Sequence, residues 1–278
     1  MGEVRVVTDS ACDLPPQLVE ELGIDVVPLT IRFGTEELVD RRDLTPDQFW
    51  ARCNASPVLP ETAAPAPGAF HAAYANAADQ GCTGVVCVNL SGALSATHQS
   101  AVTAASTSPI PVRAVDSRSI SLAQGIMVLA AARAAAAGKS MEDVAGLSED
   151  LVSRTRLFGT LDTLDYLKKG GRIGSAAALL GSMLAIKPVI QLVDGAVAEE
   201  SKQRTRGRAL QYVADKVRKA GEIENLGVLN GAASDLDQLL DMLADVYPRD
   251  QIIIGDMGAV IGSHTGPGTL GVTYHVAR

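Results

Sequence analysis

The sequence predicts an α/β fold in two domains: an N-terminal three-layer α/β/α domain with a parallel sheet over residues 1–157, and a C-terminal two-layer α/β domain with a mixed sheet over residues 158–278. The length of 278 residues fits two domains of common size. Short apolar runs alternate with helical patterns in the first half, which is typical of parallel sheets. In the second half, Asp194-Gly195 between two apolar runs predicts a hairpin, and a hairpin does not belong in a wholly parallel sheet.

In the first half, each expected strand is a short apolar run followed by a polar turn. Gly84–Asn89 is mostly apolar and β-branched, as expected of a parallel strand buried on both faces. Thr45 is the expected N-cap of a helix that starts at Pro46, and the proline-rich segment Pro57–Pro67 is expected to be a loop. The expected strands are Val4–Thr8, Val26–Phe33, Gly84–Asn89 and Val112–Val115, and the expected helices are Pro15–Leu22, Thr45–Asn54, Pro67–Ala78, the later part of Ser91–Ser106 and Ser121–Ala137.

In the second half, we expect a mixed sheet with helices on one side. Asp194-Gly195 supplies the residues with positive φ that a type I′ turn requires. The other expected elements are the helices Ser140–Thr155, Gly174–Leu184, Arg206–Ala220 and Asp235–Tyr247, the short segment Leu164–Lys169, and the strands Leu157–Thr160, Val189–Val193, Ala196–Ser201, Asn225–Leu229 and Gln251–Ile254.

Composition argues against several classes of function. Aromatic residues make up only 4% of the chain, so platforms for stacking nucleic-acid bases are scarce, and a net charge of -8 opposes binding to phosphate backbones. Arg133 and Lys187 interrupt the most apolar stretches, so none reaches the ~20 residues that span a bilayer. With no visible secretory signal, we expect a cytoplasmic protein without an integral membrane segment.

Motifs for metals, nucleotides and hydrolases are missing from the sequence. The turn after the first strand lacks the glycines of a dinucleotide site, and Gly170–Gly174 lacks the lysine of a P-loop. Ser91 lacks the glycine two residues before it that a nucleophile elbow requires. We therefore expect no cofactor and assign no catalytic residue. The cysteines show no metal-binding spacing and are expected to be buried free thiols: Cys12, Cys53, Cys82 and Cys87.

Polar segments follow the strands of the expected parallel sheet, at the edge where α/β proteins bind ligands. Ser91, Gly92, Ser95 and Thr97 follow the central strand, although Ser95 or Thr97 could instead only cap the next helix. Thr62 is the one hydroxyl in its proline- and alanine-rich segment, so its side chain is a candidate ligand contact. Asp9-Ser10 and Asp116-Ser117 follow two further strands.

The segment Ser263–Thr269 has the composition of a loop that binds a small anion. It offers hydroxyls, the imidazole of His264 and glycines that leave backbone N–H groups accessible, while Pro267 restricts the backbone. A tight turn with a solvated or core histidine is the alternative.

Two arginines are further candidates. Arg172, flanked by glycine and isoleucine, can pair with a carboxylate, dock a partner or only cap the preceding helical segment. Arg204 belongs to a basic cluster that is either a solvated face or a docking surface for an acidic partner: Lys202, Arg204, Arg206 and Arg208.

Six of these segments together resemble motifs of the DegV family, in the family's order and along the whole chain. They are Asp9-Ser10-Ala11-Cys12-Asp13-Leu14-Pro15, Glu61-Thr62-Ala63-Ala64-Pro65, Leu90-Ser91-Gly92-Ala93-Leu94-Ser95-Ala96-Thr97-His98-Gln99-Ser100-Ala101, Val115-Asp116-Ser117, Leu164-Asp165-Tyr166-Leu167-Lys168-Lys169-Gly170-Gly171-Arg172-Ile173, and His264-Thr265-Gly266-Pro267-Gly268. The resemblance implies a protein that binds one long-chain fatty acid between its two domains. In some relatives a separate fatty acid kinase phosphorylates the carboxylate to an acyl phosphate.

The resemblance also implies where the ligand lies. The carboxylate is expected at Thr62 and at Ser91-Gly92, with His264 close by. The full set of expected ligand-binding residues is Thr62, Ser91, Gly92, Ser95, Arg172, His264, Thr265 and Gly266, with Arg204 expected to dock the kinase. This chain departs from the family at Gly92, where a second serine is usual, and at Ala63 and Ala66, which replace serines. Ser91, Ser95 or the N–H of Gly92 must then supply the missing donor.

The sequence therefore predicts a lipid-binding carrier rather than an enzyme, with a fatty acid as its ligand and no cofactor. Two alternatives stay open. One is a stand-alone small-molecule kinase or hydrolase that uses His264 with Ser91, and the other is a lipid-sensing regulatory protein.

Overall fold

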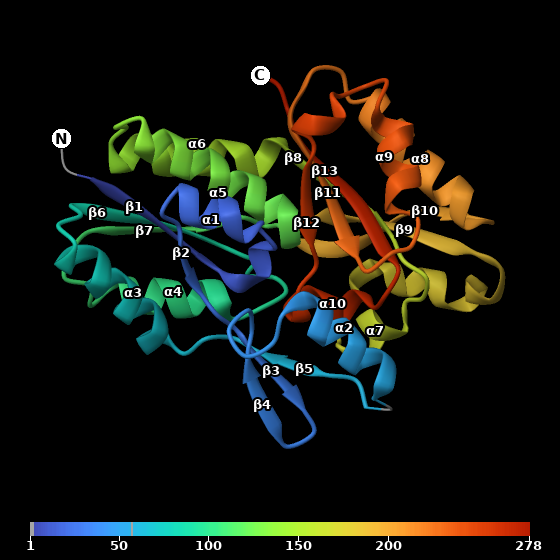
Figure 1. Ribbon diagram of the computed structural model, residues 1–278, viewed down its shortest axis with the longest axis horizontal. Coiled ribbons are helices and arrows are strands. Elements are labelled where there is room, and N and C mark those ends of the chain that lie inside the picture. The colour runs from blue at the N-terminus through green and yellow to red at the C-terminus, as the bar shows by residue number, and fades with distance from the viewer. Residues whose placement is uncertain (1–2, 57) are drawn as a thin grey trace.

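The computed structural model describes residues 3–56 and 58–278 and, within them, the side chains of all residues except 180–185. It contains a four-stranded parallel sheet, a six-stranded mixed sheet and a small three-stranded sheet. In Figure 1 the parallel sheet occupies the left of the molecule, the mixed sheet the right, and the small sheet extends below them. The predicted α/β fold with a parallel and a mixed sheet is confirmed. The division at residues 157 and 158 stays a prediction.

The parallel sheet has the strand order β2-β1-β6-β7. β6 is buried along its whole length because helices cover both faces of the sheet. β1 and β6 are neighbours although the chain runs from β1 to β2 first, so the strand order changes direction between β1 and β6, where α/β proteins commonly bind ligands at the carboxyl ends. The strands are β1 (Val4–Asp9), β2 (Asp25–Val27), β6 (Gly84–Asn89) and β7 (Val112–Asp116). The covering helices are α3 (Pro67–Asp79), α4 (Thr97–Ala105), α5 (Ser121–Ala136) and α6 (Met141–Arg154).

The prediction of one strand over Val26–Phe33 is wrong, because the segment is divided between two sheets. Pro28 lies at the break and has no N–H to donate to a sheet ladder. β3 (Thr30–Phe33) pairs with β4 (Glu36–Val39) and with β5 (Glu61–Ala63) in the small sheet. β5 corrects the prediction that Pro57–Pro67 is only a loop.

The mixed sheet has the strand order β10-β9-β8-β13-β11-β12. The predicted hairpin is confirmed: β9 and β10 are antiparallel, and Asp194 and Gly195 have φ of 50° and 79°. The two helices α8 (Arg206–Arg218) and α9 (Leu236–Leu243) lie together along this sheet in Figure 1. The strands are β8 (Thr155–Thr160), β9 (Lys187–Val193), β10 (Ala196–Gln203), β11 (Ile223–Gly231), β12 (Ile253–Asp256) and β13 (Thr269–Val276).

The predicted loop Ser263–Thr269 is wrong in its first part, because α10 (Ala259–Thr265) is a helix. The hydroxyls of Ser263 and Thr265 donate hydrogen bonds to carbonyls of the preceding turn, at Ala259 and Ile261 respectively. The last strand, β13, was also absent from the predicted elements although it lies between β8 and β11 in the sheet. His264 therefore occupies the last turn of a helix that leads directly into the mixed sheet.

The other helices begin close to their predicted starts, but the helix predicted over Asp235–Tyr247 ends at Leu243. Thr45 caps α2 and forms a capping box with Gln48, as its position before Pro46 predicts. The segment predicted as a helix over Gly174–Leu184 is a 3-10 helix, η2 (Gly174–Ala185). Among the described helices, none combines the length and apolar character that a bilayer span requires. The remaining segments are η1 (Ser10–Cys12), α1 (Pro16–Glu21), α2 (Pro46–Ala55), α7 (Asp165–Lys169) and η3 (Arg249–Gln251).

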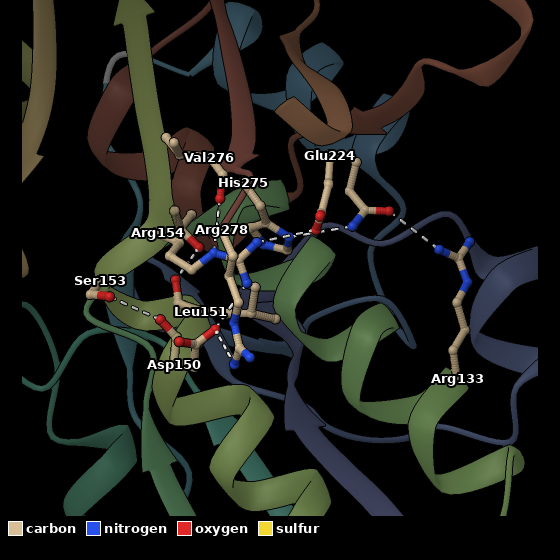
Figure 2. Close-up of polar contacts among 11 residues, drawn as sticks. Arg133, Asp150, Leu151, Ser153, Arg154, Glu224, His275, Val276 and Arg278 are labelled. Atoms are coloured by element: carbon tan, nitrogen blue, oxygen red, sulfur yellow. Dashed lines mark hydrogen bonds and ion pairs between the residues drawn. The ribbon is translucent and has the colours of Figure 1, made fainter. Parts of the chain in front are cut away.

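A polar junction ties α6 to the mixed sheet (Figure 2). Arg154 on α6 pairs with Asp150 and with Glu224 of β11, and its Nε donates to the carbonyl of Val276 at 2.8 Å. Below the surface, His275 of β13 is fully buried and its Nδ1 lies 3.3 Å from Asn225 Nδ2.

Candidate ligand-binding site

A cavity of about 190 Å³ lies where α10, β5, α7 and the start of α4 meet. Its wall is mostly apolar, and its polar groups come from residues that are far apart in the sequence. The apolar lining residues are Leu29, Ala64, Leu90, Leu94, Ala96, Ile120, Leu167, Val197, Val260 and Ile261, and the polar ones are Thr62, Ser95, Arg172, His264 and Thr265.

Thr62 and His264 form the best-defined polar contact of the cavity. Thr62 Oγ1 lies 2.9 Å from His264 Nε2, across 202 residues of sequence. Pairing of Thr62 with Ile31 in the small sheet fixes the first side chain, and the last turn of α10 fixes the second. Either group can be the donor, so the hydroxyl keeps hydrogen-bonding capacity for a ligand.

His264 is held as a neutral imidazole near pH 7. Burial, and secondarily the positive charge of Arg172, lower its pKa to about 4. Nδ1 is buried and has no hydrogen-bond partner within the described residues. The ring lies against the backbone of Gly170, where a Cβ would overlap Nδ1, so glycine at this position is what admits the imidazole.

Arg172 brings the formal positive charge to this end of the cavity. Its Nε donates to the carbonyl of Leu94 at 3.1 Å, and its Nη1 donates to that of Gly170 at 2.6 Å. These bonds hold the guanidinium beside His264 although the residue is exposed. The reading of Arg172 as a mere cap is therefore too narrow, since the side chain also lines the cavity.

Ser95 adds a hydroxyl just before α4. Its Oγ lies 2.8 Å from Thr97 Oγ1 and accepts the N–H of Thr97, so it also caps the helix start. Thr265 lines the cavity too, but its hydroxyl already donates to Ile261 within α10. Five of the eight residues predicted to bind ligand thus meet at one cavity: Thr62, Ser95, Arg172, His264 and Thr265.

Ser91, Gly92 and Gly266 are not among the lining residues of this cavity. Ser91 is fully buried and donates its hydroxyl proton to the carbonyl of Gly195 in the β9–β10 turn at 2.7 Å. In the described residues, Ser91 Oγ is bonded to Gly195 and His264 Nε2 to Thr62, so Ser91 and His264 do not form a hydrogen-bonded pair. Gly266 ends α10 with a φ of 76° and packs against the ring of Tyr166.

Gly92 has a neighbour that the sequence reasoning missed. Its N–H points at both carboxylate oxygens of Asp116, each 3.2 Å away. A Cβ on Gly92 would lie 2.9 Å from Asp116 Oδ2, so the carboxylate occupies space that a side chain at this position would need. The Gly92 N–H is thus already engaged and is a poor substitute for the missing serine.

The apolar wall was not predicted residue by residue. No local sequence signal shows that Leu90, Ile120, Val260 and Ile261 face one cavity. A second, smaller apolar cavity of about 20 Å³ shares Ile120, Ile261 and Thr265 with the first and extends over the mixed sheet toward Leu157 and Gly271. In residues 3–56 and 58–278, no cluster of His, Cys, Asp and Glu side chains is arranged to hold a metal ion.

The fold and this cavity define an α/β protein with an internal, largely apolar site that is polar at one end. The chain belongs to the DegV family, because the family model (uncharacterised protein, DegV family COG1307) matches residues 3–276. A DegV domain-containing protein of Streptomyces coelicolor is 40% identical over 97% of both chains.

Two solved structures show the same fold over nearly their whole length. A DegV family protein from Thermus thermophilus, described as fatty acid binding, is 33% identical with a TM-score of 0.91 over 99% of this chain and 100% of that one. DegV from Bacillus subtilis, described as a fatty acid binding protein, is 28% identical with a TM-score of 0.87 and full coverage of both chains.

Proposed function

We propose that this protein binds one long-chain fatty acid in the cavity, with the carboxylate at Thr62, His264 and Arg172. The observation that carries the proposal is the Thr62–His264 contact beside a guanidinium at one end of a mostly apolar cavity. The similar proteins described as fatty acid binding support the same ligand class.

Charge and burial support one direction for the ligand in the cavity. Arg172 and Ala96 are exposed, whereas Leu90, Val260 and Ile261 are buried, so the polar end lies near solvent and the apolar wall lies inside. A carboxylate needs hydrogen bonds from a cation or from neutral donors, because an unpaired charge is costly to bury. Each methylene that enters the apolar part contributes about 0.8 kcal/mol. The head group therefore stays at the mouth and the alkyl chain runs inward.

The second part of the proposal is that the protein presents the carboxylate to a separate kinase. In that reaction a carboxylate oxygen attacks the terminal phosphorus of a nucleoside triphosphate held by the partner. The bond from that phosphorus to the diphosphate breaks, and the diphosphate leaves with the electron pair, which yields an acyl phosphate. His264 is hydrogen-bonded to Thr62 and helps to orient the carboxylate. Because the imidazole is neutral, it does not add a second positive charge that would hold the carboxylate back from the phosphorus.

Arg204 is our candidate for docking the kinase. Arg204 and Arg208 are exposed and have no ion-pair partner in the part of the chain that the structure describes. Arg206 of the same basic cluster is instead paired with Asp235, and Lys202 lies 3.7 Å from Glu199. Two uncompensated guanidiniums on an acidic protein can steer an acidic partner.

Extraction under denaturing conditions followed by mass spectrometry tests the first part. Purified protein should yield close to one fatty acid per chain, since an internal apolar site retains its ligand through purification. An extract without acyl species, from protein that also fails to bind added palmitate, would refute the proposal.

The second part needs the kinase. His264→Ala should keep part of its palmitate affinity but lose acyl phosphate formation in an assay with the kinase, whereas His71→Ala, a histidine on α3 outside the cavity, should behave as the wild type. Normal phosphorylation of ligand bound to His264→Ala would contradict presentation through this residue.

A further inference from the structure

Asp13 lies at a buried joint between the parallel-sheet half and α10. Its carboxyl is 1% exposed and accepts hydrogen bonds from three separate segments. The N–H of Gly258 lies 2.8 Å from Oδ1, Arg41 Nη2 lies 2.5 Å from the same oxygen, and Ser121 Oγ lies 2.6 Å from Oδ2. One side chain therefore connects the residue before α10 to the β4–α2 loop and to the first residue of α5.

The backbone at this joint is unusual. Asp13 and Ser121 have φ of 48° and 52°, in the left-handed region that residues other than glycine rarely adopt. Their side chains bond to each other, so the contact that joins them also holds both in this conformation. These positive φ values cost conformational free energy, and the hydrogen bonds that Asp13 accepts offset part of that cost.

α10 depends on this joint for its N-terminal cap. The first N–H groups of a helix have no partner within the helix, and Gly258 has no side chain with which to cap it. Asp13 supplies the acceptor from 245 residues earlier in the sequence. A carboxyl group at this end also interacts favourably with the helix dipole.

Two aromatic residues of α2 also contact α10, one just before its start and both near its middle. Trp50 Nε1 donates to the carbonyl of Met257 at 3.1 Å. A Cβ on Gly262 would lie 2.5 Å from Phe49 Cε1, so α10 packs closely on the α2 aromatics. α10 is a continuous helix of about two turns, and His264 lies six residues beyond Gly258, about 9 Å along the axis at 1.5 Å per residue. A displacement at its start is therefore transmitted to His264.

We propose that Asp13 is a positioning residue for the head-group site: it fixes α10 so that His264 meets Thr62. The proposal rests on the function proposed above only where it concerns fatty acid affinity. Asp13 itself is not a lining residue of the cavity, so it acts through α10 and does not touch the ligand. Only a small displacement of α10 is compatible with the Thr62–His264 hydrogen bond, because the 2.9 Å bond is largely lost once the two atoms separate beyond about 3.5 Å.

The test uses Asp13→Ala, Asp13→Asn and the control Asp150→Asn. The control removes the carboxylate of Asp150 on α6, which pairs with Arg154 and Arg278 and lies far from α10 (Figure 1). The first readout is the ring signal of His264 in ¹⁵N-histidine-labelled protein at pH 7, which the four histidines of the chain make simple to assign. The spectrum of Thr62→Val defines the signal of a ring that has lost its partner. The second readout is palmitate affinity.

Asp13→Ala should move the His264 signal toward that of Thr62→Val and weaken palmitate binding at least ten-fold. Asp13→Asn, which keeps an oxygen for the Gly258 N–H, should lie between Asp13→Ala and the wild type. Asp150→Asn should match the wild type in both readouts. If Asp13→Ala does not fold, Asp13→Asn carries the test.

A folded Asp13 variant whose His264 signal and palmitate affinity equal those of the wild type would overturn the proposal. The two readouts also separate this proposal from the function. If wild-type protein does not bind palmitate, the fatty acid proposal fails, while the ring signal still decides whether Asp13 positions His264.

Discussion

Ser91 donates its hydroxyl proton to the carbonyl of Gly195 at 2.7 Å and thereby joins the loop after β6 to the β9–β10 turn. The bond crosses between the parallel and the mixed sheet, and Ser91 is fully buried. Val197, two residues beyond the turn, lines the cavity. The contact thus holds one wall of the binding site in place.

Ser91→Ala should therefore lower the free energy of unfolding by about 1–3 kcal/mol, because the Gly195 carbonyl loses its buried partner. Palmitate affinity should fall less than it does in Thr62→Val, since Ser91 does not line the cavity. Urea denaturation measures the first effect, with Ser153→Ala, an exposed serine, as the control. Equal unfolding free energies for Ser91→Ala and the control would show that this bond contributes nothing.

Thr62→Val should weaken palmitate binding by about ten-fold or more. A hydrogen bond to a charged group is worth about 1.5–3 kcal/mol, and about 1.4 kcal/mol corresponds to one decade of affinity. Isothermal titration calorimetry measures the change, and Thr103→Val, an exposed threonine on α4, should bind as the wild type does. Unchanged affinity of Thr62→Val would remove Thr62 from the head-group site.

Acid should destabilise the protein through its buried histidines. Burial lowers the pKa of His275 to about 4, so the unfolded chain takes up a proton below pH 6.5 while the folded chain does not. Above about pH 6.5, His275 is neutral in both states and does not lower the free energy of unfolding. As the pH falls from about 6.5 toward 4, the free energy of unfolding decreases by about 3 kcal/mol, at about 1.4 kcal/mol for each pH unit. His264 acts in the same direction.

Two buried carboxyl groups act in the opposite direction. Burial raises the pKa of Asp9 and of Asp40 to about 6, so the folded state holds protons there that the unfolded chain releases above about pH 4. Comparing His275→Asn with the wild type separates the contributions. The stability difference between pH 7 and pH 4.5 should be smaller in His275→Asn, and an equal difference in both proteins would contradict the assignment.

Gly266→Ala should destabilise the protein by about 1–3 kcal/mol, because Gly266 has a φ of 76° and a Cβ there would lie 2.5 Å from the ring of Tyr166. Gly207→Ala is the matched control, since Gly207 is the second residue of α8 and a Cβ there meets open space. That change should stabilise the protein by less than the roughly 0.5–1 kcal/mol typical of the middle of a helix. Thermal or urea unfolding of both variants measures the two changes in stability. If both substitutions change the free energy of unfolding in the same direction, this account of Gly266 is contradicted.

The sequence predicted the elements whose signals are local. β6 is recognisable because a strand buried on both faces is apolar throughout, and α2 because Thr45 and Pro46 form a start signal. β5 and α10 were missed for the opposite reason. β5 exists because it pairs with β3, and α10 is held by Asp13, Phe49 and Trp50, all of them distant in sequence.

The candidate site shows the same division. Thr62 and His264 could be singled out because their hydroxyl and imidazole lie in segments of unusual composition. The contact between Thr62 and His264 could not be predicted, because it depends on the small sheet and on the position of α10. Ser91 was a candidate ligand contact because it is a serine after the central strand. Its hydroxyl instead donates a hydrogen bond to the Gly195 carbonyl, and this contact depends on how the two sheets pack.

A crystal structure of the protein with palmitate tests the central claim most directly. We expect the carboxylate within hydrogen-bonding distance of Thr62 Oγ1 and close to His264 and Arg172, with the alkyl chain running past Ile120 and Ile261 into the apolar part of the cavity. A carboxylate placed at the inner, apolar end, or palmitate bound outside this cavity, would contradict it.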